Sequence, residues 1–220
     1  MISCALFLLV GIANCSPPGT VVECSNGFTN CTVSNAYGVF PDRSICRATQ
    51  VVYPSTEDEL LASVADAVQK NQKMRVVTRY AHSIPKLVCP DGDSGLIIST
   101  RDLNYVVSVD KPSLRMTFHS GITLKNLIDA AATEGLALPH SPYWLGVTLG
   151  GILGTGAHGS SLFGNGSAVH EYVVGMRLVV PASPAEGYAK VVSLTEADED
   201  LNAAKVSLGV IGVISQVVIA

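Results

Sequence analysis

The sequence feature that most constrains the fold is a glycine-rich stretch at residues 148–161, which reads TLGGILGTGAHGSS. Five of its fourteen residues are glycine, and most of the others are small. Glycine permits positive φ and lets another group approach the main chain closely. Successive free N–H groups in such a turn can form a concave anion-binding site. The stretch therefore predicts a loop that holds a phosphate-bearing cofactor. The alternative is a glycine-rich loop that only reverses the chain and binds nothing.

Three glycines of this stretch, Gly154, Gly156 and Gly159, match the spacing of the dinucleotide fingerprint of nicotinamide-binding folds. That fingerprint must follow a strand and open a helix. Gly164 and Gly166 follow too closely for a helix to begin at Gly159. No acidic residue stands about twenty positions further on at a strand end, where ribose binding would require one. We therefore interpret the match as accidental and keep the phosphate-loop prediction.

Composition indicates a folded chain and argues against one class of partner. The 220 residues suffice for one large domain or two small ones, and 48% hydrophobic with 15% charged residues predict a substantial core. The net charge is −4 and the 14 basic residues are scattered. A nucleic-acid backbone requires clustered Lys and Arg, so we expect no nucleic-acid partner.

The first residues read as a targeting signal. The apolar run at residues 2–12 is too short to span a bilayer but has the length of a signal-peptide core. Small residues follow it, although no Lys or Arg precedes it. We expect residues 1–15 to be a signal peptide, no membrane span, and a chain that is secreted or held in the cell wall. A buried first strand is the alternative.

In an oxidising compartment the remaining cysteines, Cys24, Cys31, Cys46 and Cys89, suggest two disulfides. Of the three possible pairings, nearest-neighbour closure favours Cys24–Cys31 and Cys46–Cys89. The first bridge would staple the segment 16–45. A zinc site is the alternative, but no CxxC pair or nearby His supports it.

Two tripeptides fit the acceptor pattern for N-glycosylation, which predicts a glycoprotein. They are Asn30-Cys31-Thr32 and Asn165-Gly166-Ser167. Short patterns of this kind also occur by chance.

Hydrophobic periodicity predicts a β-α-β unit in the first half of the chain. Residues 16–50 are loop-like, and a short strand is expected at 51–53. Thr56 and Glu59 have the spacing of a capping box, and 75–78 reads as a buried strand parallel to the first. Apolar residues follow the cap at helical spacing, at Leu60, Leu61, Val64, Ala65 and Val68.

The second half predicts mainly strands. A helix capped by Thr123 and closed by Gly135 is expected among them, and a later helix is expected to be capped by Thr195 and to run to Val206. Tyr143 and Trp144 precede the glycine-rich stretch and could line a cofactor wall or pack in the core. The expected strands are 96–99, 105–109, 114–119, 173–180, 191–194 and 208–220.

Residues 79–85 follow a predicted parallel strand, and ligands of parallel sheets sit at the carboxyl ends of strands. His82 is therefore placed where chemistry could occur. A purely structural histidine is the alternative.

Four segments carry a resemblance to a known family. They are CRATQVVYPSTEDEL at 46–60, RVVTRYAHSIPKLVC at 75–89, LPHSPYWLGVTLGGILGTGAHGSS at 138–161 and SLGVIGVISQVVIA at 207–220. Together they resemble the PCMH-type FAD-binding domain of the vanillyl-alcohol oxidase superfamily, and within it the plant L-gulonolactone oxidases. The third segment is the most specific.

The resemblance implies an α+β fold in which FAD lies between two parts of a domain at 46–220. The first part, 46–110, would hold the β-α-β unit. The second, 111–220, would be larger, mainly antiparallel and would carry the glycine-rich stretch. The family also has a C-terminal substrate domain, absent from these 220 residues. We therefore expect a fragment or a natural truncation with little activity alone.

The family's first phosphate loop usually reads GGGHS, and Arg79-Tyr80-Ala81-His82-Ser83 stands at that place. His82 matches the position that carries a covalent histidyl–flavin bond in many members. Arg79 can compensate with its charge for the missing glycines. By resemblance, the cofactor-binding residues are Arg79, Tyr80, Ala81, His82, Ser83, Ile84, Gly121, Thr148, Gly150, Gly151, Gly154, Thr155, Gly156, His158, Gly159, Ser160, Val213 and Ile214.

The reaction implied is FAD-dependent oxidation of a sugar lactone of the L-gulono-1,4-lactone type, to ascorbate or its precursor. Electrons would pass to oxygen or another acceptor, and no residue is assigned as catalytic. One alternative is another FAD-dependent oxidase of the same superfamily, acting on a cytokinin or an alcohol. The other is a non-catalytic secreted module that has lost its flavin. Oligomeric state is not predicted.

Overall fold

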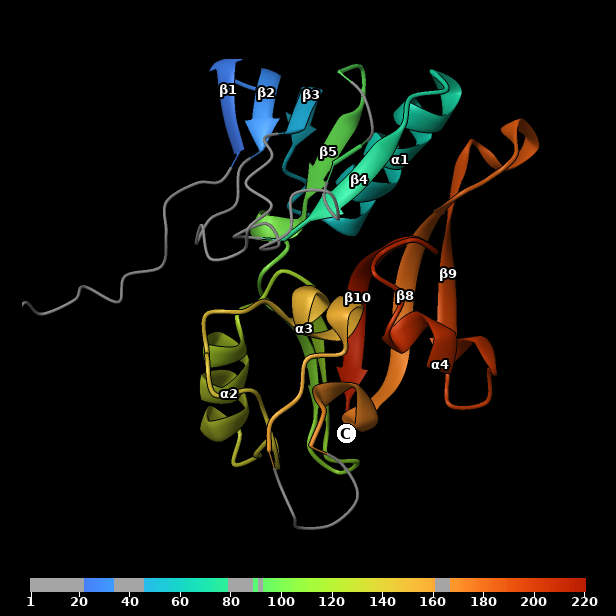
Figure 1. Ribbon diagram of the computed structural model, residues 1–220. Helices are drawn as coiled ribbons and strands as arrows, with labels where there is room; N and C mark the ends of the chain where they lie inside the picture. The colour runs from blue at the N-terminus through green and yellow to red at the C-terminus, as the bar shows by residue number, and fades with distance from the viewer. Residues whose placement is uncertain (1–21, 34–45, 79–88, 91–92, 161–166) are drawn as a thin grey trace, which may run out of the picture.

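The computed structural model describes residues 22–33, 46–78, 89–90, 93–160 and 167–220, which form two five-stranded sheets (Figure 1). The predicted signal peptide lies outside the described residues. The elements of the first sheet and its helix are β1 (Val22–Asn26), β2 (Thr29–Val33), β3 (Cys46–Val52), α1 (Glu57–Gln69), β4 (Met74–Val77) and β5 (Leu96–Ser99). Those of the second sheet and its helices are β6 (Val106–Asp110), β7 (Arg115–His119), α2 (Leu124–Thr133), α3 (Leu149–Thr155), β8 (Val173–Pro181), β9 (Ala189–Thr195), α4 (Asp200–Lys205) and β10 (Val213–Ile219).

The first sheet is mixed, with the order β1-β2-β3-β5-β4. Strands β3 and β4 both pair in parallel with β5, which lies between them. The predicted β-α-β unit is therefore confirmed in strand direction, with a third strand inserted between its two strands. On the other side, β1 and β2 pair antiparallel with each other and β2 pairs antiparallel with β3.

Helix α1 begins where its capping residues predict. The Oγ1 of Thr56 accepts a hydrogen bond from the Glu59 N–H at 3.1 Å. The Glu59 carboxylate in turn accepts from the N–H of Ser55 at 2.7 Å, one residue before the cap. Leu60 and Val64 are completely buried on the inner face of the helix.

The same helix lies between the two sheets. Its buried residues share one apolar cluster with Leu96 and Ile98 of the first sheet and with Val179, Ala189 and Val213 of the second. Burying side chains of this size stabilises a fold by about 1.5–3 kcal/mol each. The packing of α1 therefore holds the two sheets together.

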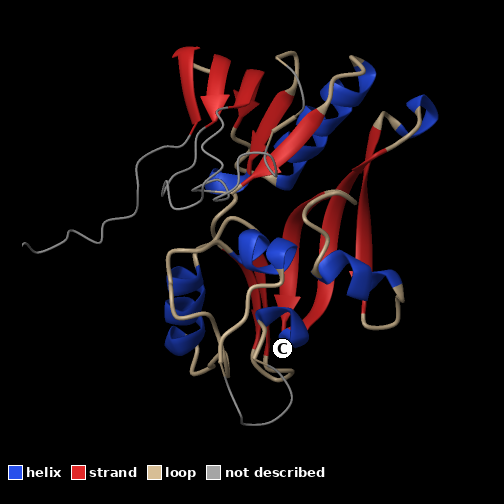
Figure 2. Cartoon of the chain, viewed as in Figure 1, coloured by secondary structure: helices blue, strands red, loops and turns tan. Residues whose placement is uncertain are grey.

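The second sheet is antiparallel throughout, with the order β6-β7-β10-β8-β9 (Figure 2). One face packs against α2, α3 and α4 in a cluster that includes Phe118, Leu127, Ile152 and Leu201. Strand β6 lies within the range predicted for the first part, 46–110, yet it pairs with β7 in this sheet. The fold is thus α+β with one mixed and one antiparallel sheet, as the sequence predicts.

The expectation that residues 16–50 are loop-like is wrong for the described part of that range. Val22–Asn26 and Thr29–Val33 form a hairpin that turns at Gly27, where φ is +69°. Polar residues dominate both strands, so the alternation that marks a strand is weak there. Cys24 lies opposite Cys31 in the register, and the two form the predicted disulfide, with their Cα atoms 4.0 Å apart.

Cys89 is disulfide-bonded, but the side chain of Cys46 lies outside the described residues, so that pairing stays a prediction. Thr195 does not cap a helix. The Asp198 carboxylate accepts from the Thr195 N–H and hydroxyl, both at 2.8 Å, which closes a turn, and α4 begins only at Asp200.

None of the helices in the described part of the chain combines the length and apolar character that crossing a bilayer requires.

Candidate functional site

The glycine-rich stretch does not form a plain loop. Residues Leu149–Thr155 form the short helix α3, and the Thr148 hydroxyl accepts a hydrogen bond from the Gly151 N–H at 3.3 Å. Glycine disfavours helix, but Ile152 and Leu153 are buried in the core of the second sheet and hold the turn in place. The helix ends at Gly156, where φ is +64°.

Helix α3 lies beside the carboxyl end of β4 (Figure 1). A Cβ atom on Gly151 would be 3.5 Å from the Oγ1 of Thr78, the residue that follows β4. Residues 79–88, which carry the predicted flavin loop with Arg79, Tyr80, Ala81, His82, Ser83 and Ile84, lie outside the described residues. Thr78 directly precedes this loop, so the chain enters it next to the glycine-rich stretch.

At Gly121, which follows β7, the main chain of the second sheet comes close to the turn that follows β5 of the first sheet. A Cβ atom there would lie 1.8 Å from the Thr100 carbonyl oxygen and 2.6 Å from that of Leu103, so only glycine fits. The Gly121 N–H donates to the Leu103 carbonyl at 2.7 Å. Gly121 was predicted as a cofactor contact. Its described neighbours are main-chain atoms of the turn after β5.

Gly150 extends this junction into α3. Its N–H donates to the Ser120 carbonyl at 2.7 Å, and a Cβ atom on it would be 3.2 Å from that oxygen. The backbone of Ser120 in turn donates to the Ser215 carbonyl of β10 at 3.0 Å. The start of α3, the end of β7 and β10 are therefore fixed to one another.

Four hydroxyl side chains are buried at this junction, each no more than 3% exposed. They belong to Ser99, Thr100, Ser120 and Thr148. The Ser120 hydroxyl has no hydrogen-bond partner among the described residues. An unsatisfied buried hydroxyl costs about 1–3 kcal/mol, so this one needs an explanation such as a polar ligand.

Sequence reasoning missed Ser99, Thr100 and Ser120. The available signal was their position, because Ser99-Thr100 ends a buried strand and Ser120 precedes a glycine.

The loop after α3 is held by its own backbone. The Gly159 N–H donates to the Ser167 carbonyl at 2.8 Å, and a Cβ atom at Gly159 would be 2.5 Å from the Ser141 carbonyl oxygen. His158 is exposed, and its Nδ1 lies 2.7 Å from the Gly159 carbonyl oxygen. This supports the interpretation of His158 as structural within the loop.

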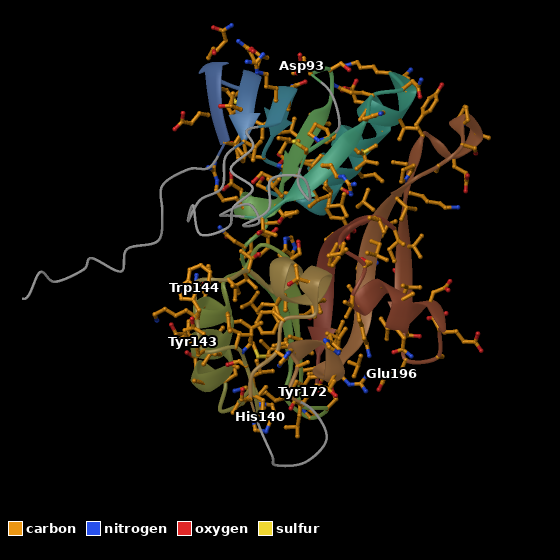
Figure 3. The ribbon with its side chains drawn as sticks, in the orientation of Figure 1. Asp93, His140, Tyr143, Trp144, Tyr172 and Glu196 are labelled. Atoms are coloured by element: carbon orange, nitrogen blue, oxygen red, sulfur yellow. A yellow bond between two sulfur atoms is a disulfide. The ribbon has the colours of Figure 1, made fainter. Side chains whose placement is uncertain are left out.

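The other predicted residues near α3 differ in exposure. Thr155 and Ser160 are exposed, whereas Gly154 is buried. The Gly154 carbonyl accepts from the Leu208 N–H at 2.9 Å, which ties the segment before β10 to α3. Tyr143 is 97% exposed at the surface, so it is not part of the core (Figure 3).

A pocket of about 320 Å³ opens beside β4, between the two sheets. Met74, Arg75 and Val76 line one wall, and residues 209–213 line the other. Val213 faces this side and packs with α1, whereas the side chain of Ile214 packs in the opposite cluster with the helices of the second sheet. Of these two predicted contacts, only Val213 lines the pocket.

A larger hollow of about 530 Å³ lies on the face of the second sheet around Arg115, Thr117 and Gln216. It contains none of the predicted cofactor-binding residues. The pocket along β4 is the better candidate for the cofactor site. Gly209, which lines it, follows Leu208, whose N–H donates to the Gly154 carbonyl of the glycine-rich stretch.

A charged network ties α1 to the second sheet near this site. Arg177 of β8 donates two hydrogen bonds to the Glu57 carboxylate, at 2.6 and 3.0 Å, and the Ser215 hydroxyl donates a third. The Arg177 side chain lowers the pKa of Glu57 below its ordinary range. Burial lowers the pKa of nearby His119, and the charge of Glu57 acts in the opposite direction. The carboxylate is thus ionised, and it links α1 to the second sheet.

Comparison with known proteins gives one family match and several relatives. A family model described as FAD binding domain matches residues 48–183. L-gulonolactone oxidase 2 of Arabidopsis thaliana is 58% identical over 214 residues, which cover 96% of this chain and 36% of that protein. L-gulono-1,4-lactone dehydrogenase of Mycobacterium tuberculosis is 32% identical over 186 residues, covering 84% of this chain and 40% of that one. The chain therefore spans little more than a third of the length of the curated relatives it matches.

Solved structures share the fold at low sequence identity. A solvent-stable cholesterol oxidase superposes with a TM-score of 0.68 at 18% identity, covering 93% of this chain and 39% of that chain. An alkyldihydroxyacetonephosphate synthase gives a TM-score of 0.66 at 22% identity, covering 78% and 33%.

Proposed function

Because this chain belongs to the FAD binding domain family, we propose that it is the flavin-binding part of an oxidoreductase that acts on sugar lactones. The observation that carries the proposal is the proximity of Thr78 to Gly151, because a Cβ atom on Gly151 would lie 3.5 Å from the Thr78 Oγ1. This proximity supports a loop that starts beside the glycine-rich stretch and carries His82. The substrate class rests on the relatives, whose names are L-gulonolactone oxidase and L-gulono-1,4-lactone dehydrogenase.

The residues at the junction fit the cofactor. Gly121 leaves no room for a side chain and Gly150 leaves little, so the main chains approach closely at the junction. The buried Ser120 hydroxyl, which has no partner among the described residues, offers a donor for a diphosphate oxygen. The Thr78 hydroxyl lies near Gly151, the residue after Gly150, and offers a second donor. These groups would hold the diphosphate of FAD.

The pocket along β4 suits the adenosine end. Four strand residues span roughly 13 Å, so the pocket beside Met74 and Arg75 is separated from Thr78 by about the length of β4. An extended dinucleotide lying along this edge strand would place its adenine against Met74 and Val213, with the diphosphate at Thr78. Arg75 lines the same pocket and adds a positive charge to it.

FAD supplies the hydride acceptor of the reaction, while the protein binds and orients it. His82 would form the histidyl bond that resemblance implies. A covalent bond keeps a cofactor on a protein that works outside the cell, where lost cofactor is hard to replace.

Flavin binding is tested on the chain itself. After purification and loading with FAD, the chain should absorb in the blue, and acid precipitation should leave the colour with the protein. In His82→Ala the colour should appear in the supernatant instead. A His158→Ala variant serves as the control and should keep the covalent colour. Failure of the unsubstituted folded chain to bind FAD would refute the proposal.

The substrate class needs a second experiment. In a chimera, this chain replaces the matching third of L-gulonolactone oxidase 2 from Arabidopsis thaliana. We expect oxidation of L-gulono-1,4-lactone by the chimera and little or none by this chain alone. A chimera that binds FAD but does not oxidise the lactone would refute the substrate class and leave the cofactor assignment standing.

The compartment is part of the same proposal. Cys24 and Cys31 form a disulfide, and structural disulfides persist in oxidising environments. Together with the apolar run at residues 2–12, this supports a secreted or cell-wall glycoprotein. A fluorescent fusion in plant cells should appear outside the plasma membrane. Retention in the cytosol would contradict it.

A further inference from the structure

We propose that Asn30 is an N-glycosylation site whose occupancy is set by competition with closure of the Cys24–Cys31 disulfide. The inference rests on the proposed secretory compartment, and it is independent of the flavin and the substrate. The modifying group would be an N-linked oligosaccharide. The site lies on the β1–β2 hairpin, at the opposite end of the strand order from β4 (Figure 1).

The acceptor side chain is accessible. Asn30 has a positive φ of +52°, so its side chain departs from the regular alternation of β2, while the next residue, Cys31, is only 1% exposed. Asn30 itself is exposed, and its side-chain nitrogen donates one hydrogen bond of 3.3 Å to the Ser25 hydroxyl. A glycan on this nitrogen would displace only that surface contact.

The folded hairpin, however, cannot present the tripeptide to a transferase. Strand β2 is paired on both sides, because Cys31 lies opposite Cys24 on β1 and opposite Ala48 on β3. A transferase must bind the backbone around its acceptor, and here the two residues that follow the acceptor, Cys31 and Thr32, are paired with both neighbouring strands. Transfer must therefore come before β2 pairs with its neighbours.

The disulfide decides how long the tripeptide stays available. Its middle residue is one of the two bridged cysteines, and only seven positions separate Cys24 from Cys31. Short loops close at low entropic cost, so this hairpin can form without the rest of the chain. Once it is bridged, the strand pairing is fixed and Asn30 is withdrawn from the transferase.

The two competing reactions are defined chemically. In transfer, the Asn30 side-chain nitrogen forms a bond to the anomeric carbon of a lipid-linked oligosaccharide. The bond from that carbon to the diphosphate oxygen breaks, the lipid diphosphate leaves with the electron pair, and the amide proton passes to a base of the transferase. In bridge formation, the two thiols give two electrons and two protons to a protein disulfide, which is reduced to a dithiol.

The test uses the 220-residue chain behind a heterologous secretion leader in a eukaryotic host, analysed only after recovery from the medium. Peptide N-glycosidase should convert the linked asparagine at position 30 to aspartate, which a peptide mass records. Asn30→Gln and Thr32→Ala should lose this signal, whereas Asn26→Gln, in the same hairpin but outside the tripeptide, should keep it. Cys24→Ser should raise the occupied fraction at Asn30.

Two results would overturn the proposal. An unmodified Asn30 in both the unsubstituted chain and Cys24→Ser would eliminate the site. Equal occupancy in these two proteins would eliminate the competition. Since neither measurement involves flavin, both outcomes are distinguishable from a failure of the cofactor assignment.

Discussion

The substitution Glu57→Gln tests how much one carboxylate contributes to holding α1 on the second sheet. Gln keeps the size of Glu but removes the charge and turns one acceptor atom into a donor, which then faces Arg177 or Ser215. Glu57 accepts three hydrogen bonds, two from Arg177 and one from Ser215. Its side chain is 16% exposed, but that of Arg177 is 41% exposed, so solvent screens part of the interaction.

Hydrogen bonds to charged groups contribute about 1.5–3 kcal/mol each when buried. With the screening at Arg177, we expect the whole network to contribute about 2 kcal/mol. Glu57→Gln should then lower the free energy of unfolding by about 2 kcal/mol, measured by urea denaturation of the flavin-free chain. In a domain of this size, that corresponds to about 4–8 °C in melting temperature.

The pH dependence separates the charge from the packing. Arg177 holds the pKa of Glu57 below its ordinary value of 4.5, so the folded state binds the proton less readily than the unfolded chain. The stabilisation is therefore complete above the ordinary pKa and is lost as the pH falls through the lowered one. The difference in unfolding free energy between the unsubstituted chain and Glu57→Gln should shrink over that acidic range.

The control is Asp66→Asn on the same helix, where the carboxylate pairs with Lys70 at an exposed position. It should leave the urea midpoint unchanged within error. A loss in Glu57→Gln that is the same at neutral and acidic pH would refute the electrostatic account. So would additive effects of Glu57→Gln and Arg177→Met, because coupled partners must be non-additive.

Three further predictions concern the junction. Gly121→Ala would place a methyl group 1.8 Å from the Thr100 carbonyl oxygen and should cost about 3 kcal/mol or more in urea denaturation, while Gly154→Ala, with no atom within 4 Å, should be neutral or stabilising. Ser120→Ala removes a buried hydroxyl that has no described partner, so it should not lower the stability of the flavin-free chain but should weaken FAD binding about fivefold to tenfold in an absorbance titration. Burial lowers the pKa of His119, so its contribution to stability is present above the ordinary value of 6.5 and is lost as the pH falls below it; in His119→Gln the slope of unfolding free energy against pH should flatten just below pH 6.5.

Local signals predicted the elements whose stabilising contacts are local. The cap at Thr56, the apolar spacing of α1 and the buried strand Leu96–Ser99 need no distant partner to be recognised. The same holds for α2, whose cap at Thr123 accepts from the Asn126 N–H and whose end at Gly135 has φ of +77°.

Elements that depend on distant contacts were not predictable in the same way. Nothing in the residues before Leu96 indicates that this strand inserts between β3 and β4, because the register is set by pairing across the sheet. Helix α3 was predicted as loop, because its glycines disfavour helix and only tertiary burial of Ile152 and Leu153 overrides that preference.

The candidate site shows the same division. The glycine-rich stretch was evident from composition, and the resemblance pointed to the loop at His82. In the sequence, Ser99 is predicted as the last residue of a strand, and Thr100 and Ser120 read as ordinary turn residues. Their importance appears only when folding buries them together at one junction.

The position of α1 has a consequence for how the molecule can come apart. Leu60, Val64 and Ala67 complete an interior to which both sheets contribute, so neither half can be closed off without them. We expect the halves to melt in one transition, and a chain divided after β5 to yield two insoluble pieces. Val64 of this helix also lines the pocket along β4, so a change in the size of that one side chain should alter the room available to a dinucleotide.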